Sequence, residues 1–378
     1  MKRWLRSIVC VVLCGTILSC SDAVPPIKDY HSFLKSDETT VNLDSDLLFS
    51  MMLYGSVASY DDDLVLFGHK QMSRIYAYRL STDSQQLLDS SSFGRSLGYS
   101  LTASASDSVW YIHHVRYADG RLVGAVCNMV SGRCYYPKST LPLYGDKYTL
   151  KAGMNLPVVN GHIFTKILST DTALHLVTLE EHSAFNHRPK LAEWQIVGDS
   201  LELVRMLCCF PEDYAATEYG DCLCEPTYNP VDSLFILPAV DGRLWLFNLE
   251  GKALGERRLG SQLEQPMSPF PITEGSYNNA LNWYANNNSY GRLIFDPYRN
   301  VYLRVMSIPP VTDADALERP DDKTWVLVVA DRDFNVKYEV QYDDYQYEWR
   351  LILPTREGVY IAKKKGDKYE KPSLFVFD

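Results

Sequence analysis

Short runs of apolar or alternating residues, separated by polar turns, recur along most of this chain. The clearest example joins Leu234–Val240 to Arg243–Leu249 through the pair Asp241-Gly242. An Asp-Gly pair between β-prone runs is a strong hairpin signal, because both central positions of a two-residue hairpin turn favour a positive φ. A third run, Ala253–Leu259, follows a second polar turn. The pattern therefore predicts three antiparallel strands of one β-propeller blade.

The same order of strands and turns predicts further units on both sides of this stretch. They occupy residues 63–93, 108–136, 160–207, 291–342 and 349–377. No segment has a sustained helical period. The units repeat in order, although their spacing is looser than the roughly 40–50 residues of regular propeller repeats. We predict an all-β fold, a six-bladed β-propeller, with a seven-bladed propeller as the alternative. A flat β-sandwich is disfavoured because this many units would overfill two sheets.

The two ends of the predicted propeller suggest how its ring closes. The last predicted strand, Ser373–Phe377, is followed only by Asp378, which leaves the final unit one strand short. An isolated strand candidate, Thr39–Leu43, lies near the other end of the chain. We expect this N-terminal strand to join the last blade, because closure removes a free sheet edge that would otherwise invite aggregation.

The N-terminus has the features of an export signal. Basic residues precede a short apolar stretch at residues 7–19. This stretch is too short for a transmembrane helix, which needs roughly 20 residues. It leads into Ile17–Cys20, which resembles the lipobox of bacterial lipoproteins, with Ser19 as the small residue and Cys20 as the acylated one. An ordinary secretory signal with a chance cysteine is the alternative, but the polar, proline-rich residues 21–28 favour a membrane tether.

These observations divide the chain into three predicted regions. Residues 1–19 are a lipoprotein signal peptide, residues 20–36 a tether and residues 37–378 a single β-propeller domain. Acyl chains stabilise membrane binding by about 0.8 kcal/mol per buried CH₂, so two chains anchor a protein stably. The expected location is therefore the cell envelope, lipid-anchored at the outer membrane on its periplasmic or surface face.

The charge balance bears on possible partners. The chain has 37 basic and 47 acidic residues and a formal net charge of −10. Nucleic-acid binding relies on clustered positive charge, so the acidic balance argues against a nucleic-acid partner. Removal of residues 1–19, which hold three basic residues and no acid, would make the net charge more negative still.

One segment carries a resemblance to a known family. Tyr290–Arg304 reads YGRLIFDPYRNVYLR. Together with the lipobox and the chain length, this segment is similar to an uncharacterised lipoprotein family of Bacteroidota with a six-bladed, TolB-like propeller architecture. The resemblance covers most of the chain after the signal peptide. It implies a lipid-anchored propeller and supplies no catalytic residues.

Several cysteines lie where export would expose them to oxidising conditions. Cys127 and Cys134 flank a predicted hairpin and can face each other. Four others lie on either side of one loop and are disulfide candidates: Cys208, Cys209, Cys222 and Cys224. Free thiols and a metal site are the alternatives for these four. Their spacing suits zinc poorly, because zinc sites usually have two to four residues between paired cysteines.

The segment before the family-like stretch alternates aromatic and amide residues. Aromatic planes and amides together suit sugars, which are recognised by stacking and paired hydrogen bonds. The candidate ligand-binding residues are Trp283, Tyr284, Asn287 and Tyr290. Packing between blades, or an ordinary polar loop, accounts for the same composition.

The sequence contains no recognised cofactor or metalloprotease motif. P-loop, zinc-protease and dinucleotide patterns are all missing from it. We therefore predict no cofactor, no metal and no catalytic residues. The expected function is a lipid-anchored binding or interaction module whose partner is an envelope protein or a glycan. The alternatives are a carbohydrate-active enzyme, either a lyase or a hydrolase, and a glycan-binding surface lipoprotein.

Overall fold

The computed structural model describes the chain in segments, most completely beyond residue 187. The described residues are 27–29, 33, 53–59, 64–69, 74–79, 84–88, 99–102, 110–118, 121–128, 133–138, 148–151, 158–159, 161–169, 187–215, 225–268, 283, 285–309, 324–342, 347–365 and 368–376. The predicted lipidation site Cys20 and the predicted closing strand Thr39–Leu43 lie outside them.

The first half of the described chain forms two sheets, in which all strand pairs are antiparallel except the parallel pair of β14 and β9. A four-stranded sheet contains β2 (Leu53–Ser59), β3 (Leu64–His69), β4 (Arg74–Arg79) and β5 (Ser84–Leu88). A nine-stranded sheet contains β6 (Tyr99–Thr102), β7 (Trp110–Ala118), β8 (Arg121–Asn128), β9 (Cys134–Pro137), β10 (Tyr148–Lys151), β11 (Val158–Val159), β12 (His162–Ser169), β13 (Leu191–Val197) and β14 (Ser200–Leu207). Within the larger sheet, β6–β9 form one up-and-down run. Strands β10, β12, β13 and β14 form a second run, which joins the first through β14–β9 and β10–β7 pairs.

The second half forms three further sheets. The next sheet contains β15 (Thr227–Asn229), β16 (Leu234–Pro238), β17 (Arg243–Phe247) and β18 (Ala253–Arg258). It is followed by a sheet of β19 (Ser289–Asp296), β20 (Val301–Ile308), β21 (Thr324–Ala330) and β22 (Val336–Tyr342), with β1 (Ile27–Asp29) added at its edge. The last sheet contains β23 (Tyr347–Pro354), β24 (Val359–Lys365) and β25 (Lys368–Phe375).

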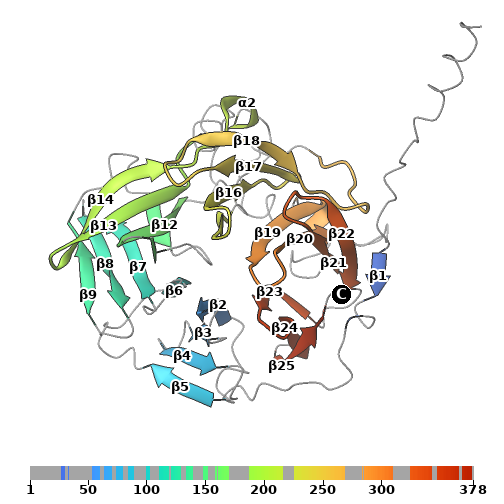
Figure 1. Cartoon of the computed structure of the whole chain (residues 1–378), viewed down its shortest axis with the longest axis horizontal. Coiled ribbons are helices and arrows are strands. Elements are labelled where there is room, and N and C mark those ends of the chain that lie inside the picture. The colour runs from blue at the N-terminus through green and yellow to red at the C-terminus, as the bar shows by residue number, and fades with distance from the viewer. Residues whose placement is uncertain are drawn as a thin grey trace, which may run out of the picture.

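The sheets lie side by side around a ring, so the fold is nearly all-β and propeller-like (Figure 1). Strands β2, β6, β19 and β23 lie toward the inside of the ring, whereas β5, β9, β14, β18 and β22 lie toward its rim (Figure 1). A short α-helix, α2 (Glu212–Ala215), follows β14 in the chain and precedes β15. No helix in the described part of the chain has the length and apolar character needed to cross a bilayer.

The central strands are buried on both faces because a sheet packs against each of them. Along β21, Trp325 and Leu327 belong to one hydrophobic cluster, whereas Val326 and Val328 belong to another. The first cluster lies between the β19–β22 and β23–β25 sheets, and the second between the β15–β18 and β19–β22 sheets. Side chains of a strand point alternately to its two faces, so a continuous apolar run is what a strand between two sheets requires.

The Asp-Gly hairpin is confirmed, but its turn differs from the predicted one. Only Gly242 has a positive φ, at 89°, while Asp241 does not. The Ala239 N–H donates to the Arg243 carbonyl oxygen over 2.9 Å, so the loop spans three residues rather than two. Hairpins with three-residue loops place a glycine in the left-handed region at their last position. This turn therefore needs only one residue with a positive φ, Gly242.

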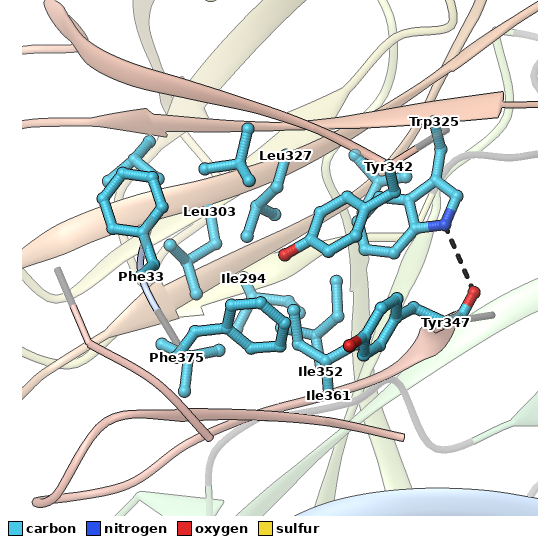
Figure 2. Close-up of a cluster of buried hydrophobic side chains, with 14 residues drawn as sticks. Phe33, Ile294, Leu303, Trp325, Leu327, Tyr342, Tyr347, Ile352, Ile361 and Phe375 are labelled. Carbon is cyan, nitrogen blue, oxygen red and sulfur yellow. Dashed lines mark hydrogen bonds between the residues drawn. The ribbon is translucent and has the colours of Figure 1, made fainter. Parts of the chain in front are cut away.

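The N-terminal segment contacts the end of the chain at a place that differs from the expected one. β1, which lies within the predicted tether, pairs in parallel with β22. Phe33 is buried against Phe375 and neighbouring residues of the last two sheets (Figure 2). Its carbonyl oxygen accepts a hydrogen bond of 3.0 Å from the Val376 N–H. The N-terminal segment therefore contacts both the β19–β22 sheet and the last sheet, which contains the C-terminal strand.

Candidate functional site

Three charged side chains from different parts of the chain converge near the inside of the ring. One lies on β12, one on β19 and one just before β15. The ammonium group of Lys166 on β12 lies 3.5 Å from one carboxylate oxygen of Glu225. The guanidinium Nε of Arg292 on β19 lies 3.6 Å from the other oxygen. Both cations are buried, whereas the Glu225 side chain is 42% exposed. Two buried cations from different elements therefore face one carboxylate that reaches solvent.

A β-bulge aims Arg292 at this position. The register between β19 and β20 shifts between Tyr290 and Leu293, so two residues of β19, Gly291 and Arg292, lie opposite one residue of β20, Val305. Bulges redirect side chains and are common beside functional sites. The Arg292 side chain therefore does not follow the regular alternation by which successive side chains of a strand point to opposite faces of the sheet.

A hydrogen bond between neighbouring inner strands sets the distance between Arg292 and Glu225. The Thr227 hydroxyl on β15 donates to the Leu293 carbonyl on β19, and both groups are buried. Glu225 lies two residues before Thr227, and Arg292 lies one residue before Leu293. The two charged residues are therefore brought together by a contact that involves neither side chain.

The third residue of the cluster is held by the nine-stranded sheet. Lys166 is the register partner of Leu191 on β13, which is fully buried. The preceding residue, Thr165, accepts a hydrogen bond of 3.0 Å from the buried indole N–H of Trp194. Burial of an ammonium group is costly unless a partner compensates it, so Glu225 stabilises Lys166 in this position.

A second polar assembly joins the β15–β18 sheet to the β19–β22 sheet. Arg304 on β20 has 0% exposure and donates to three backbone carbonyls of the neighbouring sheet. Its Nη1 lies 2.8 Å from the Gly242 oxygen and 3.3 Å from the Leu259 oxygen, and its Nη2 lies 2.5 Å from the Ala239 oxygen. The guanidinium also lies 4.6 Å from the ring centroid of Tyr290. Burial lowers the pKa of Arg304 to about 10, so it remains charged at neutral pH.

Tyr290 and Glu339 extend this assembly toward the segment after β18. The Tyr290 hydroxyl accepts from the Ser261 N–H over 2.6 Å and donates to Glu264 over 3.1 Å. Burial, followed by the Glu264 charge, raises the pKa of Tyr290. Glu339 on β22 accepts from the Ser261 hydroxyl over 2.6 Å and from the Gln262 N–H over 2.8 Å. These bonds fix the connection between two sheets, which is a structural role.

The buried Glu339 gives a testable pH dependence. Burial raises the pKa of Glu339 from its ordinary value of 4.5, and the two hydrogen bonds oppose the shift in part. The unfolded chain therefore loses this proton at a lower pH than the folded chain, so the free energy of unfolding falls as pH rises above 4.5. Glu339→Gln cannot ionise. We expect its melting temperature to rise relative to the wild type between about pH 4 and about pH 7.

The matched control for this prediction is Glu202→Gln, which alters an exposed glutamate on β14. Its melting temperature is expected to follow that of the wild type across the same range. A difference between Glu339→Gln and the wild type that stayed constant or shrank with rising pH would contradict the assignment.

The structure describes three of the four candidate ligand-binding residues. Trp283 and Tyr290 are buried, with 6% and 1% exposure, so neither ring presents a face to solvent. The Trp283 indole N–H donates to the Ser268 carbonyl over 2.9 Å. Asn287 accepts from the Ser268 N–H over 2.8 Å, and Tyr284 lies outside the described residues. The residues that are described therefore contact neighbouring protein groups.

The cysteines are described in part. Cys127 and Cys134 are register partners across β8 and β9, as their spacing around the hairpin predicted. Cys208 is buried and has φ of 61°, and Cys209 is a partly buried free thiol. Burial raises the pKa of the Cys209 thiol. Cys222 and Cys224 lie outside the described residues. Across the residues that are described, no group of His, Cys, Asp or Glu side chains is arranged to hold a metal.

The hairpin that carries Arg292 and Arg304 falls in a segment shared with other proteins. Residues 234–340 match the sequence profile of a domain of unknown function, DUF4221. The matched segment contains strands β16 to β21 and most of β22, and thus the whole assembly around Arg304. No curated protein matches the sequence.

One solved structure supports the fold. A member of the DUF4221 family from Bacteroides vulgatus is similar, with a TM-score of 0.60 and 14% identity over 88% of this chain and 94% of that chain. The β-propeller domain of Cps50 (Swd1) from Myceliophteria thermophila is more distantly similar, with a TM-score of 0.42 and 12% identity over 86% of this chain and 87% of that chain. Regucalcin, a calcium-binding protein from Agrobacterium tumefaciens, has a TM-score of 0.43 and 7% identity over 91% of this chain and 96% of that chain. The first similarity supports a shared fold and carries no statement about activity.

Proposed function

We propose that this chain is a lipid-anchored β-propeller of the cell envelope that acts as a binding module. Lipidation at Cys20 is supported by the lipobox-like Ile17–Cys20 and the polar segment that follows. A six-bladed ring is supported by the strand runs, because the nine-stranded sheet consists of two up-and-down runs and each other sheet of one.

A variant with Cys20→Ala is expected to lose a palmitate-analogue label that the wild type incorporates in cells.

The cluster of Lys166, Glu225 and Arg292 is the proposed binding site, and its ligand carries a negatively charged group. The observation that carries this proposal is the placement of one half-exposed carboxylate between two buried cations at 3.5 and 3.6 Å. Glu225 therefore occupies the position that an acidic group of a ligand would take.

Two substitutions should change binding in opposite directions. Glu225→Gln removes the competing carboxylate and should strengthen the binding of an anionic ligand. Arg292→Met removes a charged donor and should weaken binding by about tenfold or more, because a hydrogen bond to a charged group contributes about 1.5–3 kcal/mol. The measurement is isothermal titration calorimetry with phosphate, glutamate and a uronic-acid disaccharide as probes and a neutral disaccharide as comparison.

The control variant is Arg257→Met, because Arg257 is exposed on β18 and donates to the carbonyl of its neighbour Glu256. It should leave the affinity for every probe unchanged. Binding of neutral probes alone, or anion binding that neither Glu225→Gln nor Arg292→Met alters, would refute the proposed site.

A further inference from the structure

Turns of three adjacent sheets meet on one face of the ring. Asp232, between β15 and β16, forms an ion pair with Arg332, between β21 and β22. Arg299, between β19 and β20, donates to the Thr355 carbonyl over 2.9 Å and to the Arg356 carbonyl over 3.3 Å, between β23 and β24. We call this surface the turn face and define it by residues 230–233, 296–300, 331–335 and 355–358.

The direction of β1 shows from which side the N-terminal chain arrives. β1 is parallel to β22, with Ile27 opposite Glu339 and Asp29 opposite Gln341. β22 begins directly after a turn of the turn face and runs away from it. Ile27 therefore lies nearer the turn face than Asp29 does. The N-terminal end of β1 is therefore the end nearer the turn face.

β1 is held to the propeller by side chains as well as by its strand pairing. The Lys28 ammonium lies 4.4 Å from the ring centroid of Tyr338 and 4.9 Å from that of Phe33. Phe33 and Tyr338 also make an edge-to-face contact at 5.9 Å. Phe33 is in turn buried in the cluster between the last two sheets. The entry point of the chain is therefore fixed on the propeller.

Little chain separates this entry point from the proposed lipidation site. Ile27 is the seventh residue after Cys20, and a fully extended chain spans at most about 3.3–3.6 Å per residue. The Cα atoms of the two residues are thus at most about 25 Å apart. Pro25 and Pro26 precede β1, and proline has no N–H with which to continue the pairing.

We propose that the turn face is the surface that docks against the headgroup layer of the bilayer. This inference rests on the proposed lipidation of Cys20. A short tether that leaves the propeller at the turn-face side holds this surface, rather than the opposite one, next to the membrane.

The chemistry of the turn face suits lipid headgroups. A cavity of about 470 Å³ opens there, and its lining carries charges of both signs together with one aromatic ring: Arg299, Arg332, Lys337, Asp331, Asp333 and Tyr338. A zwitterionic headgroup, with its phosphate and its ammonium group, has matching charges. The face therefore presents mainly charged side chains to a hydrated, charged layer, with Val231 exposed among them.

The same orientation directs the proposed binding site away from the membrane. β15 and β19 both end at the turn face, because the turns at residues 230–233 and 296–300 follow them. Glu225 precedes β15, and Arg292 lies in the first half of β19. Both residues are thus displaced toward the opposite face, where a ligand can approach.

The test is a quenching measurement on the lipidated full-length protein in vesicles of phosphatidylethanolamine and phosphatidylglycerol. A fluorescent amino acid is introduced at Asp333 on the turn face or at Asp213 in α2, which precedes β15 on the other side. Both residues are exposed. Lipids that carry a nitroxide on the headgroup should quench the fluorophore at 333 at least twice as strongly as the one at 213.

Flotation of the vesicles separates the possible results. Protein that fails to float with the vesicles refutes lipidation and the orientation with it. Protein that floats but is quenched equally at both positions, or more strongly at 213, overturns the orientation alone. As a control, about twenty Gly and Ser residues inserted between Asp22 and Ala23 should preserve flotation and bring the quenching ratio close to one. An unchanged ratio would overturn the role of the short tether.

Discussion

Arg304→Met is expected to lower the free energy of unfolding by about 3 kcal/mol, because a buried acceptor left without its donor costs about 1–3 kcal/mol. Arg304 donates to the carbonyls of Gly242, Leu259 and Ala239, which belong to the neighbouring sheet. Methionine fills much of the same volume without donating a hydrogen bond. Relief of the buried charge offsets part of this loss. Urea denaturation followed by tryptophan fluorescence measures the effect.

Two comparisons isolate the hydrogen bonds of Arg304. Arg304→Lys keeps the charge but lacks the planar guanidinium that reaches several carbonyls at once, so its stability should lie between those of Arg304→Met and the wild type. Arg257→Met alters an exposed arginine on β18 and should stay within about 0.5 kcal/mol of the wild type. If Arg304→Met proved as stable as Arg257→Met, the guanidinium would not join the two sheets.

Arg304 also shows what the sequence reveals and what it conceals. The β19–β20 hairpin is predictable, because its apolar runs flank an Asp-Pro turn. Nothing in that pattern indicates that Arg304 crosses to the carbonyl of Gly242 in another hairpin 62 residues away. A charged residue within an apolar strand is a local signal of an unusual partner, but the partner itself is set by the packing of two sheets.

Strand positions are predictable where both faces of a strand are buried. The predicted runs Leu234–Val240 and Arg243–Leu249 begin at the same residues as β16 and β17. By contrast, β15 and β1 each contain three residues, and they were not predicted because so short a segment has no measurable periodicity. Their strand conformation depends on pairing with β16 and β22.

The candidate binding site illustrates the same limit. Lys166 interrupts an apolar strand, and Arg292 lies within the segment that carries the family resemblance, so each was visible as an unusual cation. Glu225 had no such signal, because it follows a polar loop. The convergence of these residues depends on the contact between Thr227 and Leu293, which joins strands 66 residues apart in the sequence.

The aromatic segment was interpreted by composition, and burial gives it another meaning. Aromatic and amide residues suit both sugar binding and the packing of a loop against a sheet. Tyr290 lies at the start of β19, where its hydroxyl is satisfied by Ser261 and Glu264. The sequence does not indicate which side of an inner strand such a ring faces, because that depends on the β-bulge at Gly291 and Arg292.

Trp325→Ala is expected to lower the free energy of unfolding by about 3–5 kcal/mol, the usual cost of truncating a buried tryptophan. Trp325 stacks on Tyr342 with ring centroids 3.9 Å apart, and its indole N–H donates to the Tyr347 carbonyl over 3.2 Å (Figure 2). It therefore joins β21 and β22 to β23 in the next sheet. The substitution opens a cavity and leaves the Tyr347 carbonyl without this donor.

Two variants separate these contributions. Trp325→Phe keeps a stacking ring but removes the indole N–H, so it should lose less stability than Trp325→Ala. Leu254→Ala truncates a side chain that is 53% exposed and should change stability by no more than about 0.5 kcal/mol. The measurement is the urea midpoint of each purified variant.

Since Trp325 lies in the cluster that also buries Phe33, its truncation should in addition increase hydrogen exchange at the Val376 amide, which donates to the Phe33 carbonyl. Loss of stability without faster exchange at Val376 would show that the N-terminal segment is held independently of this cluster.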